Sequence, residues 1–273
     1  TNVPEHRLVR AEREITVHDI LTHTSGIASG GLGSAISEDA IMWLDTRTSL
    51  ATNVPKYGDI VLDFQPGDRW RYSAATALDV IARIIEIESG LSFDEFVQQR
   101  IFEPLGMNDT WWNVPEEYQD RLIDIVGSDT ATPPNSAIYD TSHSTYFGAS
   151  YGLKSTAGDY LRFEQMLVNG GELFGNRLLK PQTVELMSSN QVGDLFNAMP
   201  GVSDQGFGYT VATTEESNER RSKGAFGWGG ALGTRSWSDP AEELTGVIMI
   251  QQPVPAVQND FENAVHQAIT DAN

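Results

Sequence analysis

The sequence predicts an α+β protein in which a mainly helical lobe lies beside an α/β lobe with an antiparallel sheet. Helix-like patterns dominate residues 1–205, and the hydrophobic period becomes strand-like after Gly206. A last helical segment then closes the chain. Helices followed by a meander and a C-terminal helix are typical of this class. We therefore expect a helical lobe over residues 1–205, and strands with the closing helix over 206–273.

The first helices are predicted from their caps. Thr16-Val17-His18-Asp19 has the form of a capping box and starts a short helix from Val17 to Thr22. A flexible Gly/Ser stretch to Ser34 follows, and Ser37 then caps a helix from about Glu38 to Leu50. Residues 51–71 are predicted to form a loop that ends in the turn Pro66-Gly67-Asp68.

The next helix, Ala75 to Ser89, is apolar almost all round and is predicted to lie in a core. Its polar stripe is limited to Asp79, Arg83 and Glu86. Gly90 ends it. The remaining expected elements are a helix that starts at the capping box Ser92 to Glu95 and stops before Pro104, irregular chain over 113–150, helices Ala157 to Val168 and Pro181 to Ser189, strands Gly208 to Ala212, Leu232 to Ser238 and Leu244 to Gln251, and a helix Ala256 to Ala272.

Composition excludes several function classes. The formal charge of −20 over 273 residues argues against nucleic acid and against an anionic membrane as partners. The absence of cysteine excludes disulfides, thiolate catalysis and cysteine-based zinc, and the five histidines lack ligand spacing, so we expect no metal and no cofactor. No apolar run approaches a membrane span and no signal peptide is visible. We expect a soluble protein, with the cytoplasm favoured over the periplasm or secretion.

Two short segments carry candidate chemistry. Tyr72 stands at the head of the apolar helix in Tyr72-Ser73-Ala74, where a phenol can take or give a proton. Trp228-Gly229-Gly230 lies in a Gly-rich edge strand, which can offer backbone N–H groups to a developing oxyanion. The alternatives are a tyrosine that merely anchors the helix and a Gly-rich bend. No serine stands three residues before any of the four lysines, so the chain has no Ser-x-x-Lys nucleophile motif.

The order of these segments resembles the serine β-lactamase and penicillin-binding-protein superfamily, in the class C-like branch and closest to family VIII carboxylesterases. The resemblance rests on five segments: Ile15 to Gly26, Pro66 to Gly90, Arg100 to Met107, Gly152 to Tyr160 and Phe226 to Asp239. It implies that Tyr72 is the catalytic tyrosine and that Trp228, Gly229 and Gly230 stand where relatives have Lys-Thr-Gly. Ala231 would then give its N–H to the oxyanion hole. Ala74 replaces an asparagine of the family pattern.

The resemblance further implies a carboxylesterase that acts on short-chain esters through an acyl-enzyme. The nucleophilic serine and its lysine would come from a segment that this chain lacks, since that segment normally precedes Thr16 to Gly26. We expect a small ester or amide substrate, together with a complementary N-terminal polypeptide or a homo-oligomer as partner. The alternatives are a β-lactamase or D,D-peptidase, and a non-catalytic fragment or binding scaffold.

Overall fold

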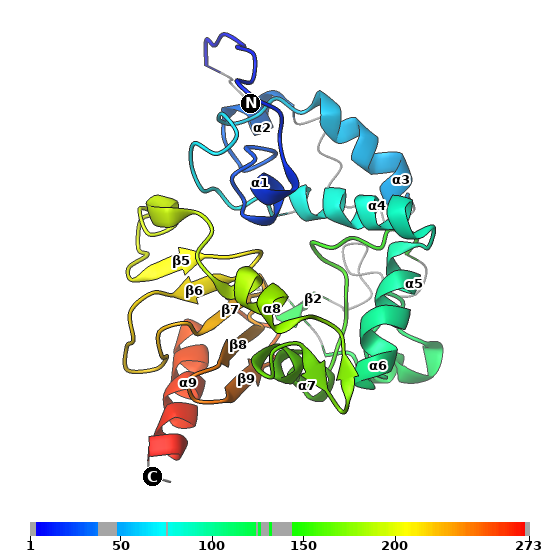
Figure 1. Cartoon of the computed structure of the whole chain (residues 1–273). Coiled ribbons are helices and arrows are strands. Elements are labelled where there is room, and N and C mark those ends of the chain that lie inside the picture. Colours follow the sequence, from blue (N-terminus) through cyan, green and yellow to red (C-terminus); the bar gives the residue numbers. More distant parts are fainter. Residues whose placement is uncertain are drawn as a thin grey trace.

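The computed structural model describes residues 4–37, 48–74, 76–123, 125–126, 131–132 and 144–270. The α+β class is confirmed: the structure combines α-helices with antiparallel sheets, and helices lie on both sides of the main sheet (Figure 1). The α-helices are α1 (Val17–Leu21), α2 (Leu32–Ile36), α3 (Leu50–Asn53), α4 (Ala77–Ser89), α5 (Phe93–Val97), α6 (Glu103–Leu105), α7 (Ala157–Val168), α8 (Pro181–Ser188) and α9 (Pro255–Thr270). The strands are β1 (Ile125–Val126), β2 (Ala131–Thr132), β3 (Glu172–Leu173), β4 (Asn176–Arg177), β5 (Gln205–Phe207), β6 (Ala212–Thr214), β7 (Phe226–Gly229), β8 (Arg235–Asp239) and β9 (Leu244–Ile248).

The main sheet is an antiparallel meander in the order β5-β6-β7-β8-β9, covered by one helix on each face. On one face, Ser238 donates a hydrogen bond of 2.8 Å to the buried carboxylate of Glu164 on α7. On the other, the ring of Trp237 meets that of Phe261 on α9, with centroids 5.8 Å apart. Successive residues of a strand point to opposite faces, which explains how Trp237 and Ser238 reach different helices.

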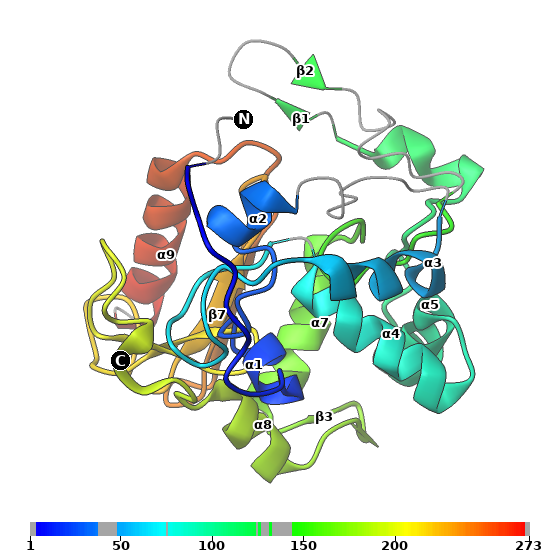
Figure 2. The same cartoon turned by 90° about the horizontal axis from the view of Figure 1, so that it is seen from above.

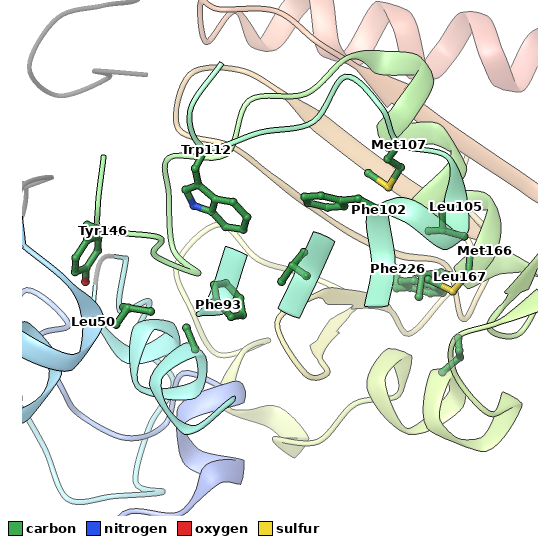
Figure 3. Close-up of a cluster of buried hydrophobic side chains, with 13 residues drawn as sticks. Leu50, Phe93, Phe102, Leu105, Met107, Trp112, Tyr146, Met166, Leu167 and Phe226 are labelled. Carbon is green, nitrogen blue, oxygen red and sulfur yellow. The ribbon is translucent and has the colours of Figure 1, made fainter. Parts of the chain in front are cut away.

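The helical lobe has a continuous apolar core that reaches the sheet (Figure 3). Trp112 packs edge-on against Phe93 at 5.7 Å, and Phe226 of β7 joins the same cluster. The other buried members are Leu50, Ala82, Val97, Phe102, Leu105, Met107, Tyr146, Met166, Leu167 and Val184. Helix α7, although it precedes the sheet in sequence, therefore belongs to both packing units. In the view from above, α1 lies between α4 on one side and β7 with α9 on the other (Figure 2).

Several local predictions are confirmed by cap geometry. The Thr16 hydroxyl accepts from the Asp19 N–H at 3.2 Å and the Asp19 carboxylate accepts from the Thr16 N–H at 2.8 Å, which completes the first capping box. Ser92 and Glu95 form the second one. Gly90 ends α4 with a φ of 73°, a left-handed conformation that glycine adopts without a Cβ penalty.

Other local predictions are wrong. The loop expected over 51–71 begins with α3 and a 3-10 helix, Val54–Asp59, while the helix expected over 38–50 falls mostly outside the described residues. Helix α2 forms in the stretch predicted to be flexible, and Ser37 ends it. The expected stop before Pro104 does not occur, because a π turn over Gln98–Phe102 shifts the hydrogen-bond register and leaves the proline in the first turn of α6.

Helix α4 is also oriented differently from the prediction of a core helix with a narrow polar stripe. Asp79, expected on a polar stripe, is fully buried, whereas Ile87 is 62% exposed. Arg83 and Glu86 do form an ion pair, at 2.8 Å, but both side chains are partly buried. The hydrophobic pattern of an almost uniformly apolar helix does not specify which side faces the core, so packing decided it.

The strand predictions hold for β8 and β9 and fail around residue 208. Residues 208–211 form the turn between β5 and β6, and Tyr209 and Thr210 of that turn bond to α1. Strand β7 is an interior strand rather than an edge strand, since Phe226 and Gly227 pair with β6 on one side and β8 on the other. Its last two residues, Trp228 and Gly229, pair with β8 alone, so the expected open edge exists only there. No helix in the described part of the chain is long and apolar enough to cross a bilayer.

Candidate active site

The structure brings together the two segments that the sequence singled out. The rings of Tyr72 and Trp228 lie 5.5 Å apart at their centroids, although the two residues are 156 positions apart in the chain. Tyr72 is 41% exposed and Trp228 is half-buried, so both present part of their surface to solvent. Tyr72 is therefore accessible to a molecule bound beside the end of β7, and accessibility is a condition for any proton transfer by its hydroxyl.

A wall of aromatic rings supports this pair. We define the aromatic cluster as Trp70, Phe196 and Phe207, all buried. Trp228 stands perpendicular to Phe207 at 5.4 Å and Trp70 lies nearly parallel to Tyr72 at 6.4 Å. Because such ring contacts fix orientation as well as position, the cluster holds both candidate residues in defined places. Sequence analysis missed Trp70 and Phe207, since apolar residues in short segments give no signal beyond burial.

Beyond Trp228 the chain turns sharply and leaves backbone groups accessible. Gly229, Gly230 and Ala231 are all exposed. The turn into β8 is closed by hydrogen bonds from the Gly230 N–H to the Thr234 carbonyl at 2.8 Å and from the Gly233 N–H to the Gly230 carbonyl at 3.0 Å. The Ala231 N–H takes no part in these two bonds. A Cβ at position 230 would lie 2.2 Å from the Thr234 hydroxyl oxygen, so a larger residue there would need the Thr234 side chain to turn away.

The side chain of His23 lies beneath Tyr72 and is a second feature that the sequence did not identify. Its ring centroid is 4.8 Å from that of Tyr72, and the residue is 2% exposed. Burial lowers its pKa to about 4, so the imidazole is neutral at pH 7. His23 lies within Ile15 to Gly26, one of the five segments that carry the family resemblance, but the sequence pattern does not single out this histidine. Ser25 in that segment is buried, with its hydroxyl accepting from the Ile27 N–H at 3.3 Å.

Behind the Tyr72 segment, a buried carboxyl fastens α4 to residues 146–150. Asp79 accepts hydrogen bonds from the Tyr146 hydroxyl and from the Ala149 N–H, the latter at 2.8 Å. The Tyr57 hydroxyl lies 3.0 Å from that of Tyr146 and extends the network. Burial is the largest influence on the Asp79 carboxyl and raises its pKa above the ordinary value. No basic side chain is among the hydrogen-bond partners of Asp79 in the described residues.

Arg235, which lies just after the Gly-rich turn, faces away from the site. Its position in β8 is opposite Gly229, while Trp228 is opposite Ser236, so Arg235 and Trp228 point to opposite faces of the sheet. Its guanidinium donates to the Glu262 carboxylate on α9 at 2.8 Å. Three lysines also have partners of their own: Lys56 bonds Asn53, Lys154 bonds the Trp112 carbonyl and Lys223 pairs with Glu216.

Within the described residues, no three His, Asp or Glu side chains gather as potential metal ligands. The site instead offers a phenol, an aromatic wall and a Gly-rich turn. These groups suit the binding and activation of an uncharged molecule.

Comparison with known proteins assigns the chain to a family. The family model described as Beta-lactamase matches residues 2–270. Protein Rv1367c of Mycobacterium tuberculosis (strain ATCC 25618 / H37Rv) is 31% identical over 272 residues, and lovastatin esterase of Penicillium rubens is 28% identical over 268 residues. These alignments cover 91% and 89% of this chain, and the chain spans 65% of the length of each relative. The solved structure of EstCE1, a hydrolase with promiscuous acyltransferase activity, superposes with a TM-score of 0.74 at 20% identity, covering 93% of this chain and 71% of that one.

Proposed function

The chain belongs to the beta-lactamase family, and from the geometry of its candidate site we propose that it is the larger part of a serine carboxylesterase. The observation that carries the proposal is the contact between Tyr72 and Trp228 on a face of the sheet from which Arg235 is turned away. An apolar ring therefore stands where an anionic substrate would need a cation. An uncharged short-chain ester fits such a surface better than a carboxylate-bearing β-lactam.

The proposed reaction is acyl transfer in two steps. A serine hydroxyl attacks the ester carbonyl and loses its proton through a nearby lysine and Tyr72, while the N–H of Ala231 and that of the serine bind the oxyanion. The same proton passes to the leaving alkoxide as the carbon–oxygen bond of the ester breaks. Water then attacks the acyl-enzyme, releases the acid and restores the serine.

We propose that the serine and lysine come from a segment outside residues 1–273, because no Ser-x-x-Lys is present within them. That segment belongs to a complementary N-terminal polypeptide or to a second copy in a homo-oligomer. The exposed apolar side chains of α4, Ile84 and Ile87, are consistent with a surface that another segment covers.

The name of one relative supports an esterase, since the Penicillium rubens protein that is 28% identical to this chain is a lovastatin esterase. The β-lactamase or D,D-peptidase alternative requires recognition of a carboxylate, and Arg235, the basic residue in the strand beside Trp228, is instead bonded to Glu262. A non-catalytic scaffold remains the alternative outside enzymes.

The test compares two substrates with the protein expressed from its complete coding sequence. We expect kcat/KM for a short p-nitrophenyl ester to exceed that for a chromogenic cephalosporin by at least about tenfold, the effect of one missing charge-assisted contact. Labelling by a fluorophosphonate, followed by peptide mapping, locates the serine. Comparable turnover of the cephalosporin would support the lactamase, and absence of turnover and of labelling would support the scaffold.

A further inference from the structure

His23 touches the chain on both sides of Tyr72. Its backbone carbonyl accepts a hydrogen bond from the Arg71 N–H at 3.0 Å, and its Nδ1 accepts one from the Ser73 N–H at 3.4 Å. The first distance is ordinary and the second lies at the long end of the range. Together the two hydrogen bonds connect Arg71 and Ser73, the residues on either side of Tyr72, to His23.

The imidazole also supports the phenol ring directly. Its plane lies at 71° to that of Tyr72, an edge-to-face contact, and Trp70 and Phe207 enclose it at 6.0 and 5.5 Å. Because Nδ1 accepts from Ser73, the proton of the neutral ring is assigned to Nε2. The low pKa of His23 keeps that acceptor available throughout the neutral range.

The backbone of His23 is held in a conformation that few residues adopt. Its φ is 56°, in the left-handed region, which costs energy for residues other than glycine and is found most often for Asn, Asp and His. Two hydrogen bonds of 2.8 Å next to it, from the Thr24 N–H to the Asp19 carbonyl and from the Gly67 N–H to the Thr24 carbonyl, fix the turn. A strained residue that persists under such restraint is a feature of functional sites.

We infer that His23 is a positioning residue that fixes the Tyr72 hydroxyl for proton transfer. The inference rests on the proposed function, in which Tyr72 moves the proton. His23 itself does not reach the substrate; it acts by holding Arg71 and Ser73 and by supporting the phenol ring. Displacing a proton-transfer group by about 1 Å lowers the rate by up to about 10²-fold, while substrate binding by the aromatic cluster is retained.

The experiment compares three substitutions in the protein expressed from its complete coding sequence. His23→Asn places an amide oxygen close to the position of Nδ1 and tolerates the left-handed backbone, so it preserves the acceptor. His23→Leu removes the acceptor at similar size. His23→Gly also removes the acceptor, and glycine adopts a φ of 56° freely. This variant therefore tests the inference even if His23→Leu does not fold. Ser25→Ala, a buried change in the same turn without contact to Tyr72, is the matched control.

We expect kcat for the ester to fall about 10- to 100-fold in His23→Leu and His23→Gly, with KM within about threefold of wild type. We expect His23→Asn and Ser25→Ala to stay within about fivefold on both constants. Amide hydrogen exchange at Ser73, a readout that needs no activity, should be faster in the leucine and glycine variants and near wild type in the asparagine variant.

The outcomes separate this inference from the proposed function. An inactive wild-type protein refutes the esterase, and exchange at Ser73 then decides the role of His23 alone. Unchanged exchange in His23→Leu, wild-type kcat in that variant, or an equal loss in His23→Asn overturns the inference. So does an equal loss in Ser25→Ala, which would indicate general destabilisation of the turn.

Discussion

Replacing Trp228 by lysine should shift the preference of the site from neutral to anionic substrates. Trp228 points to the same face of the sheet as Ser236, and its ring meets that of Tyr72, so an ammonium group at this position would enter the candidate site. Arg235 does not supply that charge in the native protein, because it lies on the other face and is bonded to Glu262. The substitution therefore places a cation beside Tyr72, where the native protein has the apolar ring of Trp228.

The magnitude of the shift follows from two terms that act in the same direction. A charge-assisted contact with a substrate carboxylate stabilises by about 1.5 to 3 kcal/mol, which corresponds to about 10- to 150-fold in kcat/KM for a cephalosporin. Loss of the ring contacts with Phe207 and Tyr72 costs about 0.5 to 1.5 kcal/mol each, which lowers stability and weakens turnover of neutral esters. Both terms raise the ratio of cephalosporin to ester turnover.

The assay measures kcat/KM for a chromogenic cephalosporin and for a short p-nitrophenyl ester in the wild type, Trp228→Lys and Trp228→Met. The methionine variant loses the ring but gains no charge, so it isolates the electrostatic term. A third variant, Glu262→Gln, frees Arg235 on the opposite face and should leave the ratio unchanged. An equal rise in the methionine variant, or no rise with lysine, would refute the assignment of Trp228 to the substrate surface.

Three further outcomes are expected. In Tyr72→Phe, ester kcat should fall about 10²- to 10⁴-fold while circular dichroism and the unfolding midpoint stay near wild type, because only the proton-transferring hydroxyl is lost. In Asp79→Ala, urea denaturation should show a free energy of unfolding lower by about 2 to 5 kcal/mol, since a buried phenol and two backbone N–H groups lose their acceptor. Asp19 is buried, which acts to raise its pKa, but hydrogen bonds from Arg13 and Thr16 lower the pKa far below the ordinary value. The stabilising contribution of the Asp19 carboxylate is therefore complete at neutral pH and declines below about pH 4. The difference in free energy of unfolding between wild type and Asp19→Asn should become smaller from pH 6 to pH 3. A difference that stays constant over this range would contradict the prediction.

The sequence by itself determined the class, the caps and the meeting of the two candidate segments. Capping boxes at Thr16 and Ser92 and the glycine after α4 act within one turn of chain, so their geometry follows from neighbouring residues alone. The order of segments indicated the family, and the family fold places Tyr72 near Trp228. The function of these residues, and the segment that supplies the serine, remain predictions.

Tertiary structure decided what local patterns leave open. Which side of the apolar helix α4 is buried depends on partners far along the chain, and this buried Asp79 while exposing Ile87. The π turn before Pro104 and the place of β7 inside the sheet likewise depend on packing and pairing over long distances. His23 became a candidate only when folding placed its ring against Tyr72, because no period or motif records a contact between residues 49 positions apart.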